Sequence, residues 1–189
     1  MERLLTGAEF VGLFPSYIWL DVEASSLSVD SFPIEIGWCA ADLVADSFLV
    51  KPLERWTDWS IASELIHGIQ LQELFDQGID AAEAAREINR ICAGKQVLSD
   101  NPVSDGDWLK QLFHDTGVRQ EFELHDSRQL EAMAAALSKL TPAWAQSLVE
   151  QINGRFPHPH RAGPDARREV ARFLALVLPE EVETISALA

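Results

Sequence analysis

A pair of carboxylates lies in an otherwise apolar segment near the start of the chain. Residues 17–23 read YIWLDVE, aromatic and β-branched at first and then alternating, which is typical of a strand leaving a core. Side chains two apart on a strand leave the same face, so Asp21 and Glu23 would lie side by side. The apolar flanks argue against the alternative, a solvated edge strand. Because neighbouring like charges repel unless a cation neutralises them, the segment predicts a strand that binds Mg²⁺ or Mn²⁺ through oxygen ligands.

Four further segments are predicted to be strands. Residues 34–40 and 45–51 are joined by a short connection, which indicates an antiparallel meander of three strands together with residues 17–23. Residues 96–99 and 121–125 follow, and they alternate with helical patterns. This order predicts an α/β domain with a mixed five-stranded sheet, three antiparallel strands and then two parallel ones, flanked by helices.

Helical periodicity fills the segments between these strands. A capping pattern at Asp80 and Glu83 begins one helix, Pro142 stops another, and Pro164 suits the first position of the last. The predicted helices are a short one ending at His67-Gly68 and others near 81–92, 106–114, 130–140 and 164–177.

The length of 189 residues and the apolar fraction of 47% suit one globular domain. We expect a single domain over residues 1–189, with a core at about 17–177 and a short acidic C-terminal tail. No stretch reaches the ~18 to 20 apolar residues that a bilayer requires, and residues 1–15 contain no secretory apolar region. Cys39 and Cys92 lie far apart without metal-binding spacing. We therefore expect two small core residues, a reducing cytoplasm and no membrane.

The charge is strongly acidic but unevenly distributed. Lys and Arg number 15 against 30 Asp and Glu, a net charge of −15, which at first sight argues against a nucleic-acid partner. Residues 155–172, however, hold five arginines against Asp165 and Glu169, a local net charge of +3. Most such clusters are solvated helix faces, and the alternative is a phosphate-binding segment.

A second group of carboxylates follows the strand predicted at 96–99. Residues 98–109 read LSDNPVSDGDWL, with Asp100, Asp105 and Asp107 as candidate ligands. Acidic residues are common as caps at helix N-termini, so each alone is ambiguous. Sites in α/β sheets gather at the carboxyl ends of strands, and we favour Asp105 as the ligand.

The third group precedes the last helix. In HPHRAGPDARR, residues 158–168, His160 stands five positions before Asp165. A loop histidine is usually structural, but a neutral imidazole with a pKa of ~6.5 can take a proton from metal-bound water near neutral pH. The surrounding arginines, Arg161 among them, are placed where a phosphate substrate can use them.

In this order, the three groups resemble the DEDDh 3′–5′ exonucleases, which have the ribonuclease H-like fold. The resemblance covers roughly residues 17–177 and includes all five signature positions. It implies that Asp21, Glu23, Asp105 and Asp165 hold two Mg²⁺ or Mn²⁺ ions, and that His160 is the general base. Two such ions stabilise the attacking and leaving oxygens of a phosphodiester displacement. The implied activity is hydrolysis from the 3′ end of single-stranded or short nucleic acid, releasing 5′-mononucleotides.

The resemblance also implies substrate contacts. Leu27 matches a leucine that family members place against the terminal bases, with a core leucine as the alternative. His67 matches a segment where a substrate contact is possible, with a helix C-terminal histidine as the alternative. Ser26 stands where the family usually has glycine, next to these contacts. We take Leu27, Ser26, His67 and Arg161 as candidate substrate-binding residues.

Two further departures affect the packing of the motifs. Ser104 replaces a bulky aromatic residue before Asp105. Gly163 and Pro164 replace the usual residues after the last histidine, so we expect the final helix to start late and His160 to be more mobile. Neither departure removes a ligand.

Two other functions compete with the exonuclease. One is a catalytically retired exonuclease fold that serves as a binding module, although such domains commonly lose ligands and none is missing. The other is a two-metal nuclease that acts on structured RNA or internal bonds. The acidic chain predicts a footprint of only a few nucleotides of RNA or DNA, because each bound phosphate needs a cation. A homodimer is plausible from the resemblance.

Overall fold

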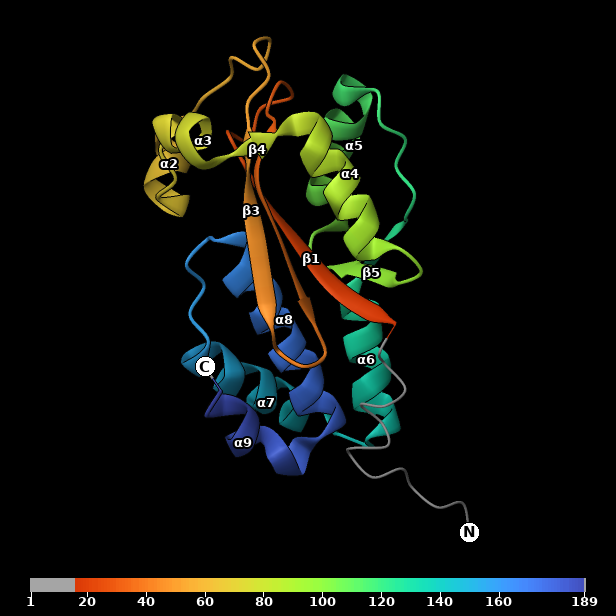
Figure 1. The fold of residues 1–189 in the computed structure, drawn as a ribbon. Helices are drawn as coiled ribbons and strands as arrows, with labels where there is room; N and C mark the ends of the chain where they lie inside the picture. The colour runs from red at the N-terminus through yellow and green to blue at the C-terminus, as the bar shows by residue number, and fades with distance from the viewer. Residues whose placement is uncertain (1–15, 189) are drawn as a thin grey trace.

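A mixed sheet of six strands forms the centre of the protein in the computed structural model, which describes residues 16–188 (Figure 1). Residues 1–15, in which no secretory region is expected, lie outside the described part. The strands lie in the order β4-β3-β2-β1-β5-β6. Their bounds are β1 Tyr17–Ala24, β2 Pro33–Ala40, β3 Ala45–Lys51, β4 Ile79–Asp80, β5 Gln96–Ser99 and β6 Leu124–Asp126. The pairs β1·β2 and β2·β3 are antiparallel, whereas β5 runs parallel to β1 and β6 parallel to β5.

The prediction of five strands is wrong by one, because β4 adds a parallel edge strand of two residues beside β3. Only Val50–Ile79 and Lys51–Asp80 are paired, which is too short to leave a sequence pattern. Gly78 permits the close approach: a Cβ atom there would lie 2.7 Å from the backbone nitrogen of Lys51. Asp80 caps α4 as predicted, since its side chain accepts from the N–H of Ala82.

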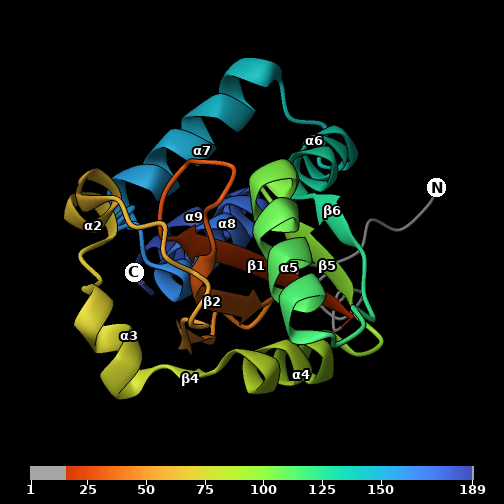
Figure 2. The same ribbon diagram turned by 90° about the horizontal axis from the view of Figure 1, so that it is seen from above.

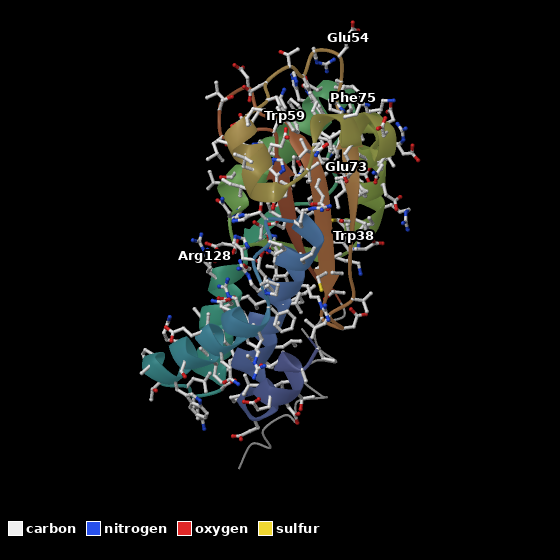
Figure 3. All side chains as sticks on the ribbon, turned by 90° about the vertical axis from the view of Figure 1, so that its left-hand side faces the viewer. Trp38, Glu54, Trp59, Glu73, Phe75 and Arg128 are labelled. Carbon is white, nitrogen blue, oxygen red and sulfur yellow. The ribbon has the colours of Figure 1, made fainter. Side chains whose placement is uncertain are left out.

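Helices cover both faces of the sheet (Figures 1 and 2). Their bounds are α2 Ile61–His67, α3 Leu71–Gln77, α4 Ala81–Cys92, α5 Pro102–Thr116, α6 Ser127–Leu137, α7 Pro142–Arg155, α8 Ala162–Val177 and α9 Val182–Ser186. One core packs Trp19 of β1 against α6, α7 and α8, and the other packs Leu20 of the same strand against α4 and α5. Charged side chains such as Glu54 and Arg128 extend outward (Figure 3). The alternation along β1 therefore buries both faces of that strand.

The helices differ from the sequence predictions in particular places. α6 already ends at Leu137, so the prediction that Pro142 stops this helix is wrong. Pro142 instead occupies the first position of α7, which the sequence pattern missed, and Thr141 caps α7 by accepting from the N–H of Trp144. α5 begins at Pro102, earlier than predicted, and α8 begins at Ala162, so the expected late start of the last helix is wrong. Beyond Val177 the acidic segment forms a 3₁₀ turn and α9, whose Ile185 is buried in the core.

Both cysteines are free and buried, as predicted for small core residues. Burial raises the pKa of each thiol to about 12, so neither is a nucleophile at neutral pH. Within residues 16–188, every helix is too short or too polar to cross a bilayer.

Candidate active site

Four carboxylates from three parts of the chain converge beside β1. Asp21 and Glu23 lie on β1, Asp105 lies in the first turns of α5 directly after β5, and Asp165 lies in the first turn of α8. The parallel pairing of β5 with β1 brings the α5 residue to this position, and α8 packs across β1 and β2. One ligand oxygen from each of Asp21, Glu23 and Asp165 lies within 4.8 Å of the other two. The structure thus places three of the four predicted ligands within reach of one ion, and Asp105 lines the same cavity as Asp21 and Glu23.

A cavity of about 330 Å³ opens at this point. Asp21, Glu23 and Asp105 line it, together with His158 and His160 from the loop before α8. The connection between β1 and β2, drawn in orange, passes between α2 and α5 (Figure 2), and its residues Ser26 and Leu27 line the cavity. The carboxylates therefore face a space that a substrate can enter.

Asp105 and Asp165 are held in place by short local contacts. The hydroxyl of Ser99, the last residue of β5, donates to Oδ2 of Asp105. The backbone N–H of Arg161 donates to Oδ2 of Asp165 over 3.1 Å, and Nδ1 of His158 lies 2.8 Å from the other oxygen, Oδ1. Each carboxylate thus has a defined orientation before any ligand binds.

Burial and mutual repulsion raise the pKa values of the carboxyl groups. Burial is the main reason that the pKa of Asp21 lies well above its usual range, and Asp105 and Glu23 add to it. The pKa of Glu23 rises to about 7 through burial and the charge of Asp165, and the pKa of Asp105 rises to about 8, mainly through burial. Close carboxylates in a poorly solvated position are stabilised by a divalent cation. The all-oxygen donor set of these residues fits Mg²⁺ or Mn²⁺.

The structure adds Glu35, which sequence reasoning missed. It lies on β2 directly opposite Glu23 and is only 1% exposed. Its oxygens accept from Nε of Arg161 at 2.9 Å, from the N–H of Ala162 at 3.0 Å and from the hydroxyl of Ser47 at 2.9 Å. Glu35 therefore anchors the start of α8, and it engages the guanidinium that was expected to contact substrate. The sequence signal that could have revealed Glu35 is its position inside the otherwise apolar strand of residues 33–40.

A second missed glutamate, Glu169, lies one helical turn after Asp165. It is 2% exposed and accepts a hydrogen bond of 3.0 Å from the Ser127 hydroxyl. One carboxylate oxygen from each of Glu169, Asp21 and Asp100 lies within 4.8 Å of the other two. Burial, followed by the charge of Asp100, raises the pKa of Glu169 well above its usual range. Its spacing of four from Asp165 is the sequence signal that could have revealed it.

Two imidazoles, not one, lie at the loop before α8. The ring centroids of His158 and His160 are 4.1 Å apart, and His160 has a positive φ of 53°. The pKa of His160 is lowered by burial and by His158, against the opposing charge of Asp165. His158 was missed, although its place in the HPH triplet was visible.

The remaining predicted residues border the cavity in different ways. Leu27 is 90% exposed and lines it, so the alternative of a core leucine is wrong. His67 is the last residue of α2, which agrees with the alternative of a histidine at a helix C-terminus. Its buried ring also lines the cavity. Its Nδ1 accepts from the N–H of Ile69 over 3.0 Å, while Nε2 has no hydrogen-bond partner among the described residues. Ser26 lines the cavity as well, and its hydroxyl donates to Asp58.

The sheet order and the carboxylate cavity beside β1 define an α/β fold of the exonuclease type. Comparison with solved structures identifies exonuclease I as a protein with this fold. The zinc-bound complex of the E. coli enzyme with ssDNA matches with a TM-score of 0.64 and 18% identity over 91% of this chain. The E. coli enzyme in complex with a dA16 oligonucleotide matches with a TM-score of 0.62 and 15% identity over 89%.

The likeness shows that this chain has the α/β fold of exonuclease I, a mixed sheet flanked by helices, as the resemblance to exonucleases predicted. This chain spans 42% of the length of the exonuclease I chains in both complexes. Neither a protein-family model nor a curated protein matches the sequence.

Proposed function

We propose that this chain is a metal-dependent 3′–5′ exonuclease that acts on short or single-stranded nucleic acid. The observation that carries the proposal is the convergence of Asp21, Glu23, Asp105 and Asp165 with His160 in or beside one cavity of an exonuclease-type fold. A retired binding module is disfavoured because the five residues are all present and close together.

The four carboxylates would hold two divalent ions, Mg²⁺ or Mn²⁺. When bound, such ions polarise the scissile phosphate and lower the pKa of a water ligand. The chain's own contribution is to fix the carboxylates: Ser99 orients Asp105, and the Arg161 N–H orients Asp165. Burial and neighbouring charges raise the pKa values of Asp21 and Glu23, and bound cations would lower them again by stabilising the charged carboxylates.

His160 would accept the proton of the attacking water. Its lowered pKa keeps the imidazole neutral at pH 7, the form that can act as a general base. Its place on the loop before α8 depends on Glu35, which holds Arg161 and Ala162. The Arg161 side chain, although paired with Glu35, is still 38% exposed and would be able to contact a phosphate.

The terminal nucleotide would lie against Leu27, Ser26 and His67, and the next one in the neighbouring cavity of about 710 Å³. Leu27 and Trp108 line both cavities, so they are suited to contact bases. The net charge of −15 favours a footprint of a few nucleotides of RNA or DNA. A homodimer and a cytoplasmic location remain predictions.

The test uses 5′-labelled RNA and DNA oligonucleotides with Mg²⁺ or Mn²⁺. The wild-type protein should produce a ladder shortened from the 3′ end, and EDTA or Asp21→Asn should abolish it. Asp76→Asn, an exposed carboxylate on α3, is the matched control and should retain activity. Cleavage of a circular single-stranded substrate would instead support a nuclease of internal bonds. Activity that survives both EDTA and Asp21→Asn would refute the proposal.

A further inference from the structure

Two histidines and an aspartate form a compact donor group at the N-terminal end of α8. Nδ1 of His158 lies 2.8 Å from Oδ1 of Asp165, and one ring nitrogen of His160 completes a set whose atoms lie within 4.8 Å of one another. Ligand atoms of a tetrahedral zinc site lie about 3.3 Å apart, given metal–ligand distances of about 2.0 to 2.1 Å. Small side-chain movements therefore suffice to enclose an ion.

The surroundings favour this geometry. Asp165 is 2% exposed, and its second oxygen is already fixed by the N–H of Arg161, in the way that outer contacts orient metal ligands. The His158 side chain is 44% exposed, so an ion can reach the group from solvent. The three ligands would leave one coordination position open.

We propose that His158, His160 and Asp165 form a binding site for a transition-metal ion of the Zn²⁺ or Co²⁺ type. Imidazole nitrogen suits these ions, whereas Mg²⁺ prefers oxygen ligands and retains water. The donor set of two nitrogens and one oxygen thus differs in chemistry from the all-oxygen set of Asp21, Glu23, Asp105 and Asp165, with which it shares only Asp165.

The site has a consequence for activity, which rests on the proposed function. Asp165 cannot serve both ion sets fully, and an imidazole that binds a metal through its lone pair cannot accept a proton. Occupancy by Zn²⁺ would therefore withdraw one carboxylate from the Mg²⁺ set and remove the general base. The ion would act as an inhibitor.

Metal binding is measured first, on the full chain and without nucleic acid. Zn²⁺ is titrated by calorimetry in the presence of excess Mg²⁺, and Co²⁺ is titrated by visible absorption, which detects tetrahedral nitrogen-containing sites. The wild-type protein should bind one equivalent. His158→Ala should weaken binding at least 10- to 100-fold, the range known for the loss of outer contacts alone.

His114→Ala is the matched control. His114 is an exposed imidazole whose Nδ1 lies 3.2 Å from Asp115, an analogous pair without a second histidine nearby. This variant should bind the ions like wild type. Thermal unfolding in EDTA checks that both variants are folded, and His158→Asn replaces His158→Ala if the alanine variant is not.

Equal affinity of wild type and the folded His158 variant would overturn the proposal, as would the absence of binding in the wild type. If the ions bind as expected but the protein has no exonuclease activity with Mg²⁺, the metal site stands and the proposed function fails. If the protein is active and Zn²⁺ does not inhibit it, the inhibitory consequence is refuted.

Discussion

Replacing Glu23 with glutamine should stabilise the metal-free protein, and the gain should depend on pH. Burial and the charge of Asp165 raise the pKa of Glu23 from 4.5 to about 7. Because its protonated form is favoured in the folded state, the glutamate does not disfavour folding below pH 4.5. Above pH 7 its charge lowers the free energy of unfolding by about 3 kcal/mol, at 1.36 kcal/mol for each unit of pKa.

Urea denaturation in EDTA measures the effect. At pH 8 Glu23→Gln should raise the free energy of unfolding by about 1 to 3 kcal/mol, the lower values arising if neighbouring carboxyls take up protons instead. At pH 4.5 the gain should fall to about 0.4 kcal/mol, because the glutamate is then almost fully protonated in the folded state and half protonated in the unfolded state. Saturating Mn²⁺ should reverse the order at pH 8, because wild type regains a ligand that the variant lacks.

Glu123→Gln is the control, since this glutamate is exposed and a surface change should stay within about 0.5 kcal/mol at every pH. A Glu23→Gln variant less stable than wild type at pH 8, or a gain that is the same at both pH values, would show that Glu23 is not destabilised by its neighbours. The electrostatic case for a cation site would then fail.

Three further outcomes are expected. His160→Ala should lower kcat by about 10²- to 10⁴-fold, as for the loss of a general base, while Mn²⁺ binding by calorimetry is retained; unchanged kcat would remove His160 from the mechanism. Glu35→Gln should lower the free energy of unfolding by about 2 to 4 kcal/mol in urea, because the Arg161 guanidinium loses its charged partner, and an effect no larger than that of Ser47→Ala would contradict this. Leu27→Ala should raise KM for short oligonucleotides without changing the melting temperature, because the side chain is 90% exposed; a large loss of stability would mean that it packs in a core.

The predicted ligands could be found because each lies next to a local signal. Asp21 and Glu23 belong to a period-2 apolar strand, Asp105 follows a strand and begins a helix, and Asp165 lies in the first turn of an amphipathic helix. Strand and helix periodicity is a property of neighbouring residues, so it can be read without knowing the fold.

Other elements depend on contacts that no local pattern encodes. The strand β4 exists because Gly78 allows two residues to pair with the end of β3, and it has no periodicity of its own. The pattern around Pro142 does not predict α7, because a proline suits both the end of one helix and the first position of the next, and here it begins α7.

The α/β class, the chain order of the main strands and the shared face of Asp21 and Glu23 follow from local sequence patterns, since spacing sets which side chains share a face. The full set with Asp105, Asp165 and His160 follows from the resemblance to the exonucleases, and its role stays a prediction. Only the tertiary structure placed Glu35 opposite Glu23 and Glu169 beside Asp21, and brought His158 against Asp165. The physical reason is that strand register and helix packing join residues far apart in the chain. The burial and the charge partners of a carboxylate or an imidazole are set by those neighbours and not by its own segment.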